Sequence, residues 1–374
     1  MAVDDEDVVT AERVLVKDKE LAAAVEHSAE NNGKPLTDEA LLALFVSKEL
    51  SEGTPYACTL PSIQPSGVCM RAEDSDLLPR AYAECAKATR KYAVDQYQAC
   101  AAALHAVGSS APDEADFLAA FAHVRARSVE VNDEQGADIE APSPLLRTGS
   151  GRRRALLPAF DLLNHRAGAS THLKREGGLW RVEADDAYAA GEQVFVTYGE
   201  RDNLKMLLQY GFVLADNDEA IVLFDCRDLV EGCVRARPHL FDEVKEALLE
   251  QLTAAQEAAA PEAGGGDGDG AFQRLALFSY DAVNRVPRES LVAALGMMET
   301  VLPALGGSEE EATTFVDDAL RAMLTARHDE LMARLEDATR LEGKEQGKAT
   351  EGSLRDPIMA LLRAEQQSLT EILG

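Results

Sequence analysis

The chain has 374 residues, of which 46% are hydrophobic, so it can bury the core of one large domain or of two ordinary ones. Its formal net charge of −29 argues against a general nucleic-acid-binding protein, which normally carries a basic face. A basic protein segment would suit this negative field, although acidity can also serve solubility alone.

The six cysteines are scattered, and none forms a CxxC pair or joins histidines at zinc-ligand spacing. We therefore expect free thiols in a reducing compartment and no metal site. No apolar run approaches the roughly 18 residues that indicate a membrane span, and the acidic N-terminus lacks the features of a signal or transit peptide. We expect a soluble intracellular monomer that binds neither membranes nor nucleic acid.

The N-terminal half is predicted to alternate helices with irregular segments. Several valines give residues 7–16 the character of a short β-segment. Apolar residues at helical spacing, behind start signals such as Thr37-Asp38, predict helices over residues 36–50, 81–107 and 109–131. Residues 54–67 are rich in proline and irregular, and the polar, Gly/Pro-containing residues 132–154 indicate a surface loop.

From residue 155 the pattern changes to short β-segments and turns, and later to helices. The predicted β-segments cover residues 155–163, 171–184, 192–199 and 220–226. Gly177-Gly178, flanked by alternating residues, predicts a hairpin. The remainder is predicted to be helical, with a flexible Gly-rich linker at 261–271 between helices over residues 239–260, 289–305, 312–338 and 354–373.

Two polar side chains, Asn164 and His165, end the apolar run that begins at Leu156, and burying them without partners would be costly. This stretch, "LLPAFDLLNH", is one of four ordered motifs. The others are "HVRARS" at 123–128, "AGEQVFVTYGERDN" at 190–203 and "LLQYGFV" at 207–213. With these motifs the sequence resembles the SET-domain protein methyltransferases, in the branch typified by the Rubisco large-subunit lysine methyltransferase.

The resemblance implies an α+β fold: a SET-type β-fold with a pseudoknot, a large helical insertion and a C-terminal, mainly helical, substrate-binding lobe. It places the SET domain at residues 1–215, with the insertion at about 35–150 and the core at 151–215. The lobe would then cover residues 216–374. The implied activity is protein-lysine N-methylation of a non-histone protein, with S-adenosylmethionine as cofactor and an accessible lysine segment as substrate.

The same resemblance assigns roles to individual residues. It places Arg127, Asn164 and His165 against the cofactor. It makes Tyr198 the catalytic residue, because its hydroxyl could orient a lysine amine or polarise the methyl donor. The alternatives for single residues are a satisfied core histidine at His165 and a packing tyrosine at Tyr198.

The resemblance also implies substrate-binding residues. Asp161 could line the lysine channel or stabilise its turn, and Tyr210 and Phe212 would form channel walls. For Phe212, simple packing is an equal alternative.

Two other functions stay open from the sequence: a protein-histidine methyltransferase, and a catalytically weak SET scaffold that binds a protein partner. The sequence also departs from the family, because no Gly-rich G-x-G turn precedes Val14 and Ala126 stands where relatives often have serine. We therefore expect the chain to be N-terminally incomplete, with weakened cofactor binding and an exposed strand edge near residues 8–16.

Overall fold

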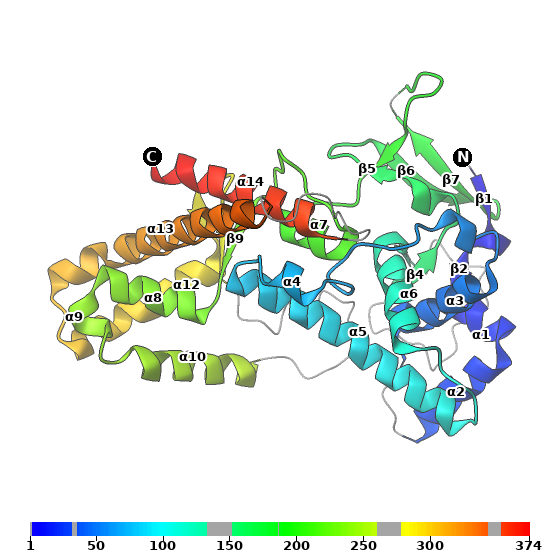
Figure 1. The fold of residues 1–374 in the computed structure, drawn as a ribbon, viewed down its shortest axis with the longest axis horizontal. Coiled ribbons are helices and arrows are strands. Elements are labelled where there is room, and N and C mark those ends of the chain that lie inside the picture. Colours follow the sequence, from blue (N-terminus) through cyan, green and yellow to red (C-terminus); the bar gives the residue numbers. More distant parts are fainter. Residues whose placement is uncertain (1, 32–35, 133–151, 186, 260–277, 343–352) are drawn as a thin grey trace. The chain divides into compact units, whose positions relative to one another are not determined.

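The computed structural model describes the chain except for residues 1, 32–35, 133–151, 186, 260–277 and 343–352 (Figure 1). Its described residues divide into two compact units. Unit 1 comprises residues 2–69 and 90–201, and unit 2 comprises Met70–Thr89 with the described residues after Arg201. Helix α5 (Arg80–Ala106) begins in unit 2 and ends in unit 1.

Unit 1 contains three small sheets. Two of them are three-stranded, with the orders β1-β7-β6 and β2-β4-β3, and the third pairs β5 with β8. The strands are β1 (Ala2–Asp4), β2 (Val9–Thr10), β3 (Val129–Asn132), β4 (Arg152–Leu156), β5 (Asn164–His165), β6 (Thr171–Glu176), β7 (Leu179–Ala184) and β8 (Phe195–Val196). All pairs are antiparallel except β5 with β8, which is parallel.

The predicted Gly-Gly hairpin is confirmed, since β6 and β7 pair with Glu176 opposite Leu179. Gly177 and Gly178 have φ angles of 60° and 77°. Two consecutive residues with positive φ are what a two-residue hairpin turn of this kind requires, and glycine adopts them without a Cβ penalty.

The N-terminal segment differs from the prediction for residues 7–16. Strand β2 covers only Val9–Thr10, and helix α1 (Ala11–Lys17) follows directly, with the Thr10 hydroxyl accepting a hydrogen bond from the Arg13 amide at 3.4 Å. The valines follow a helical phase, because Val14 is buried whereas Val16 is 74% exposed. The expectation of an exposed strand edge near residues 8–16 is therefore wrong for the residues in α1. Only β2, at the end of its sheet, is an edge strand in this range.

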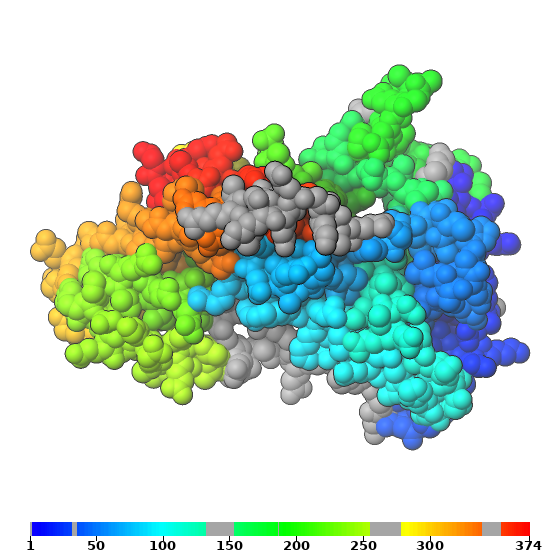
Figure 2. Space-filling model, in the orientation of Figure 1, coloured from blue at the N-terminus to red at the C-terminus, as the bar shows by residue number. Residues whose placement is uncertain are grey.

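The helical part of unit 1 comprises α1, α2 (Lys19–Glu30), α3 (Asp38–Glu52), the 3-10 turn η2 (Ala57–Thr59), the end of α5 and α6 (Glu114–Arg127). The predicted cap of α3 is confirmed, since the Thr37 hydroxyl accepts from the Ala40 amide at 3.3 Å. Helix α3 packs against α6 through the buried residues Leu41, Leu42, Phe117 and Phe121. Figure 2 shows α3 in blue and the ends of α5 and α6 in cyan as one continuous surface.

The helix predicted to reach residue 131 ends at Arg127, because Ser128 adopts an extended conformation. Val129 and Val131 then favour a strand, and β3 pairs with β4 so that Val129 faces Ala155. The prediction of a loop over residues 132–154 is therefore wrong at both ends, because Asn132 belongs to β3 and residues 152–154 belong to β4. Residues 133–151 lie outside the described part.

Unit 2 is mainly helical, as predicted for the C-terminal part. It contains the start of α5 and the helices α4 (Ala72–Ser75), α7 (Asn203–Tyr210), α8 (Cys226–Ala236), α9 (Pro238–Phe241), α10 (Lys245–Ala259), α12 (Glu289–Val301), α13 (Glu309–Glu342) and α14 (Arg355–Leu373), with the 3-10 turn η5 (Leu302–Leu305). Long helix α13 packs against α8 and α14. The predicted linker at 261–271 lies outside the described residues.

A three-stranded sheet in the order β11-β10-β9 accompanies these helices. It consists of β9 (Ile221–Phe224), β10 (Phe278–Asp281) and β11 (Val286–Pro287). Strand β9 confirms the β-segment predicted at 220–226, whereas the other two strands were not predicted.

A buried ionic network ties the start of α5 to the rest of unit 2. The Arg327 side chain is 2% exposed, and its nitrogens lie 3.4 Å from Glu365 and 3.2 Å from Asp228. The Tyr82 hydroxyl donates to the other Glu365 oxygen at 2.6 Å. Arg80 pairs with the Asp228 carboxylate at 2.9 Å. Residues 70–89 therefore share both an apolar core and a charge network with residues more than a hundred positions later.

Candidate functional site

The Asn164-His165 pair forms strand β5, at the end of a turn that begins in the core of unit 1. Leu156 and Leu157 are buried, Ala159 has a positive φ of 72°, and the Asp161 amide donates to the Leu157 carbonyl at 3.1 Å. A 3-10 turn, η4 (Phe160–Leu162), then leads into β5. A positive φ is unfavourable for alanine, so surrounding contacts must hold this turn.

Tyr198 lies just after β8, the strand that pairs with β5. Its hydroxyl donates to the Leu163 carbonyl at 2.9 Å, and its backbone amide donates to Nδ1 of His165 at 3.0 Å. The two rings lie 5.1 Å apart between centroids. The structure thus brings together two motifs that the sequence separates by more than thirty residues.

The surroundings of His165 favour the neutral form of its imidazole. Burial lowers the pKa of its imidazole below the ordinary value. Because Nδ1 accepts the hydrogen bond from Tyr198, the proton of the neutral ring is on Nε2. Asn164, by contrast, is exposed.

Arg127 and Asp161, two further predicted residues, are also in contact. The Arg127 guanidinium at the end of α6 donates to the Asp161 backbone carbonyl at 2.7 Å. The Asp161 side chain is 9% exposed, and burial raises the pKa of its carboxyl above the ordinary range. One turn earlier on α6, burial and the Arg127 charge lower the pKa of His123 to about 4.

Tyr56 joins this cluster and was not predicted as a site residue. Its hydroxyl donates to Oδ2 of Asp161 at 2.9 Å. Burial, with the nearby Asp161 charge, raises the pKa of this phenol well above its ordinary value, so it stays a donor. The only sequence signal was a tyrosine inside an irregular, proline-rich segment, and no spacing rule links position 56 to position 161.

Tyr210 and Phe212 belong to unit 2. Tyr210 ends α7, and its ring lies 6.1 Å from that of Phe212, both side chains being half-buried. Gly211 between them has a φ of 82° and closes the helix, its amide donating to the Leu207 carbonyl at 3.0 Å. Their role as channel walls stays a prediction.

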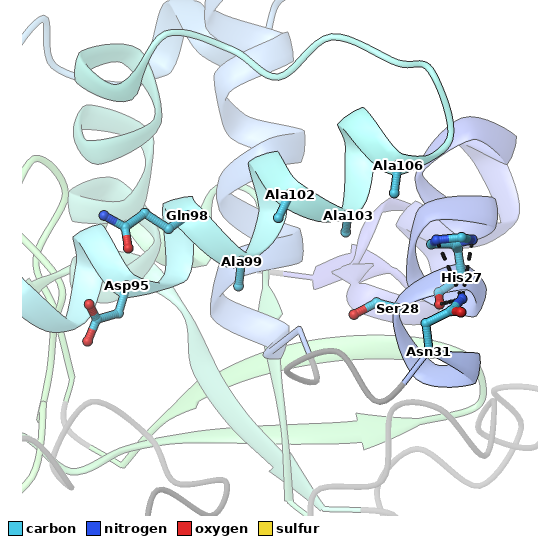
Figure 3. A pocket seen from close by; sticks show the side chains of 9 residues that line it. All are labelled: His27, Ser28, Asn31, Asp95, Gln98, Ala99, Ala102, Ala103 and Ala106. Atoms are coloured by element: carbon cyan, nitrogen blue, oxygen red, sulfur yellow. Dashed lines mark hydrogen bonds between the residues drawn. The ribbon is translucent and has the colours of Figure 1, made fainter.

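A separate depression of about 350 Å³ lies between the end of α2 and one face of α5 (Figure 3). An alanine face of α5 lines it together with polar residues such as His27 and Asn31 at the end of α2. Asn31 donates its side-chain amide to the His27 carbonyl at 2.9 Å. None of the predicted site residues lines this depression.

The described residues contain neither a metal-binding cluster nor a membrane-spanning helix. No group of three or more His, Cys, Asp or Glu side chains in the described ranges could hold a metal ion. Likewise, none of the described helices combines the length and the apolar character needed to cross a membrane.

The whole described chain has the fold of a SET-domain protein. It matches a crystal structure described as the SET domain of LSMT bound to lysine and AdoHcy, with a TM-score of 0.56 and 17% identity, over 100% of this chain and 80% of that one. A structure of Rubisco LSMT bound to sinefungin and monomethyllysine matches with a TM-score of 0.55. The predicted α+β fold class is therefore confirmed.

Sequence relatives agree with this fold, although no family model matches the chain. "SET domain-containing protein 4" of Artemia parthenogenetica is 25% identical over 201 residues, which are 52% of this chain and 49% of that protein. Its human namesake is 26% identical over 186 residues, 47% of this chain and 40% of the relative. The chain thus spans about half the length of these relatives, and the resemblance to SET-domain methyltransferases is confirmed.

A shorter match concerns an enzyme named by its activity. "N-lysine methyltransferase setd6" of Xenopus laevis is 33% identical over 84 residues, which are 22% of this chain and 16% of that protein.

Proposed function

We propose that this chain is an S-adenosylmethionine-dependent protein-lysine N-methyltransferase acting on a non-histone protein. The observation that carries the proposal is the hydrogen bond from the Tyr198 hydroxyl to the Leu163 carbonyl, directly beside Asn164-His165. It fixes a phenol oxygen next to polar residues that could contact a methyl donor. Relatives named as N-lysine methyltransferases, and fold neighbours described with AdoMet or AdoHcy, support the same activity.

The residues present fit the proposed cofactor. Nε of Arg127 is buried and makes no hydrogen bond within the part of the chain that the structure describes. A buried guanidinium donor suits a carboxylate, and the exposed Asn164 amide offers both a donor and an acceptor. We assign Arg127, Asn164 and His165 to cofactor binding. When bound, S-adenosylmethionine supplies a methyl group on a sulfonium centre.

Tyr198 would orient the substrate amine. A lysine must lose its proton before its lone pair can attack, although its reference pKa is about 10.4. The Tyr198 hydroxyl donates its proton to the Leu163 carbonyl, and a phenol oxygen can in addition act as an acceptor for an amine N–H. Because burial favours the neutral form of His165, its imidazole contributes little positive charge that would oppose a sulfonium. Positioning of this kind supplies much of the rate in a displacement reaction.

The substrate would be a protein segment carrying an accessible lysine. We assign Asp161, Tyr210 and Phe212 to its binding, and the net charge of −29 suits a basic segment. In the same proposal, residues 1–215 are the SET domain and residues 216–374 the helical substrate-binding lobe.

The test uses a cell lysate incubated with the chain and isotope-labelled S-adenosylmethionine, followed by mass-spectrometric mapping of the labelled residue. The expected result is a labelled lysine in a non-histone protein, absent with Tyr198→Phe. Calorimetry measures cofactor binding in parallel. A labelled histidine would assign the histidine-methylating class instead. Cofactor binding without any labelled protein would overturn the enzyme proposal.

A further inference from the structure

Three hydrogen bonds from separate segments of unit 1 meet on the short turn formed by residues 161–163. Tyr56 donates to the Asp161 carboxylate at 2.9 Å, and Arg127 donates to the Asp161 carbonyl at 2.7 Å. Tyr198 donates to the Leu163 carbonyl at 2.9 Å. The turn is therefore held at one end by Tyr56 and Arg127, and its other end receives the Tyr198 hydroxyl.

This turn needs external support. It follows Ala159, whose φ of 72° is unfavourable for a residue with a Cβ atom. Local backbone preference thus works against the conformation that places Asp161 and Leu163. Hydrogen bonds from outside the turn, those of Tyr56 and Arg127 among them, therefore help to hold it.

We propose that Tyr56 is a positioning residue for methyl transfer: its hydroxyl orients the Asp161 carboxylate and so fixes the turn whose last carbonyl accepts from Tyr198. The inference rests on the function proposed above. It assigns Tyr56 no contact with substrate or cofactor. Its effect passes through Asp161 and Leu163 to the phenol of Tyr198.

The hydroxyl can be separated from the ring. The Tyr56 ring lies 6.5 Å from that of Phe45, an aromatic contact that Tyr56→Phe retains. Tyr92 provides a matched control in the same unit, because its hydroxyl also donates to a carboxylate, that of Glu39, at 3.2 Å, and its ring lies 5.9 Å from Phe121. Each substitution removes one hydrogen bond from a tyrosine hydroxyl to a carboxylate, but only that of Tyr56 reaches the turn at residues 161–163.

Kinetics supply the first measurement. Tyr56→Phe is expected to lower kcat at least tenfold while the cofactor Kd changes less than twofold. Tyr92→Phe should leave kcat within twofold. Equal kcat values for the two variants would overturn the inference.

The pH profile supplies a readout that a general loss of stability does not move. Burial raises the pKa of the Asp161 carboxyl, while the hydrogen bond from Tyr56 and the charge of Arg127 counteract that rise. The other titratable groups nearby are His123, beside Arg127, and Glu49, near Tyr56. Losing the Tyr56 donor should move the acidic limb of the kcat profile to higher pH. An unmoved limb contradicts the inference.

A stability cycle tests the same link without any activity. Thermal midpoints are measured for Tyr56→Phe, Tyr198→Phe and the double variant. Because the two hydroxyls act through one turn, the shift of the double variant is expected to differ from the sum of the two single shifts. The cycle of Tyr92→Phe with Tyr198→Phe should be additive. Additive shifts in both cycles overturn the inference. If the wild-type chain transfers no methyl group but the midpoint shifts of Tyr56→Phe and Tyr198→Phe are non-additive, the proposed function is wrong while the structural link between the two residues stands.

Discussion

At the scale of single residues, the hydroxyl of Tyr198 is the most exacting test of the proposed chemistry. Tyr198→Phe removes only this oxygen, and the ring contact with His165 at 5.1 Å can persist. We expect the rate of methyl transfer to fall by about two to four orders of magnitude, as for other positioned proton-donating or proton-accepting groups. Cofactor affinity, measured by calorimetry, should stay nearly unchanged. Full activity of the phenylalanine variant would remove Tyr198 from the mechanism.

Most residues of the candidate site could be predicted because they sit in contiguous motifs. Asp161, Asn164 and His165 lie in one stretch, and direct hydrogen bonds connect Asp161 to Arg127 and His165 to Tyr198. Tyr56 could not be predicted in this way. Its partner is 105 positions away, and only the folded chain brings the two together.

At the scale of the elements, Asp38 makes the first turn of α3 sensitive to pH. This buried carboxylate accepts from the Arg154 amide of β4 at 3.2 Å, and burial raises its pKa to about 6, with Glu12 adding to the shift. A carboxyl with a raised folded-state pKa favours folding at low pH, and this contribution is lost as pH rises from about 4 through 6.

Asp38→Asn should remove that dependence, since an amide keeps an acceptor oxygen but does not ionise. The free energy of unfolding of the variant, relative to wild type, should rise by about 2 to 3 kcal/mol between pH 4 and pH 8. Chemical denaturation at each pH measures it, with Asp116→Asn, at an exposed position in the first turn of α6, as the control. Parallel pH curves for Asp38→Asn and wild type would show that Asp38 is not the titrating group.

A glycine sets the approach of α8 to α13 in unit 2. A Cβ on Gly232 would lie 2.3 Å from the Met323 side chain and 3.2 Å from the Ala319 carbonyl, whereas one on Gly296 in α12 would meet nothing within 4 Å. Gly232→Ala should therefore destabilise the chain by about 1 to 3 kcal/mol through overpacking. Gly296→Ala should stabilise it by about 0.5 to 1 kcal/mol. Thermal unfolding measures both variants. Equal shifts of their midpoints would show that α8 and α13 are not closely packed at Gly232.

Helices were predicted well at this scale because their apolar periodicity extends over many residues, as in α3 and α5. Several short strands were missed, namely β1, β3, β10 and β11, whereas β9 was predicted. A strand as short as β2 or β11 carries too few residues for alternation, and its pairing depends on distant partners such as β4. For α1, a threonine cap and a helical burial phase outweighed the β-propensity of its valines.

At the scale of the whole molecule, Arg327 is the residue on which the charge network of unit 2 depends. Arg327→Met would leave Glu365 and Asp228 without their shared cation, and breaking a buried ion pair in this way costs about 3 to 5 kcal/mol. Arg334→Met on the same helix removes a partly exposed pair with Glu330 and should cost less than about 1 kcal/mol. Denaturant unfolding compares them, and similar losses would show that the network contributes little.

The membership of residues 70–89 in unit 2 has a consequence for synthesis of the protein. Within the described residues, the chain passes between the two units after Cys69, Thr89 and Arg201. On the ribosome, Leu78 and Tyr82 therefore emerge well before the later residues that bury them. Until the chain beyond Arg201 has been synthesised, we expect this apolar stretch to stay exposed and to bind chaperones. A crosslinker at position 82 should capture a chaperone in a nascent chain stalled at residue 201, and should lose it once the full chain is released.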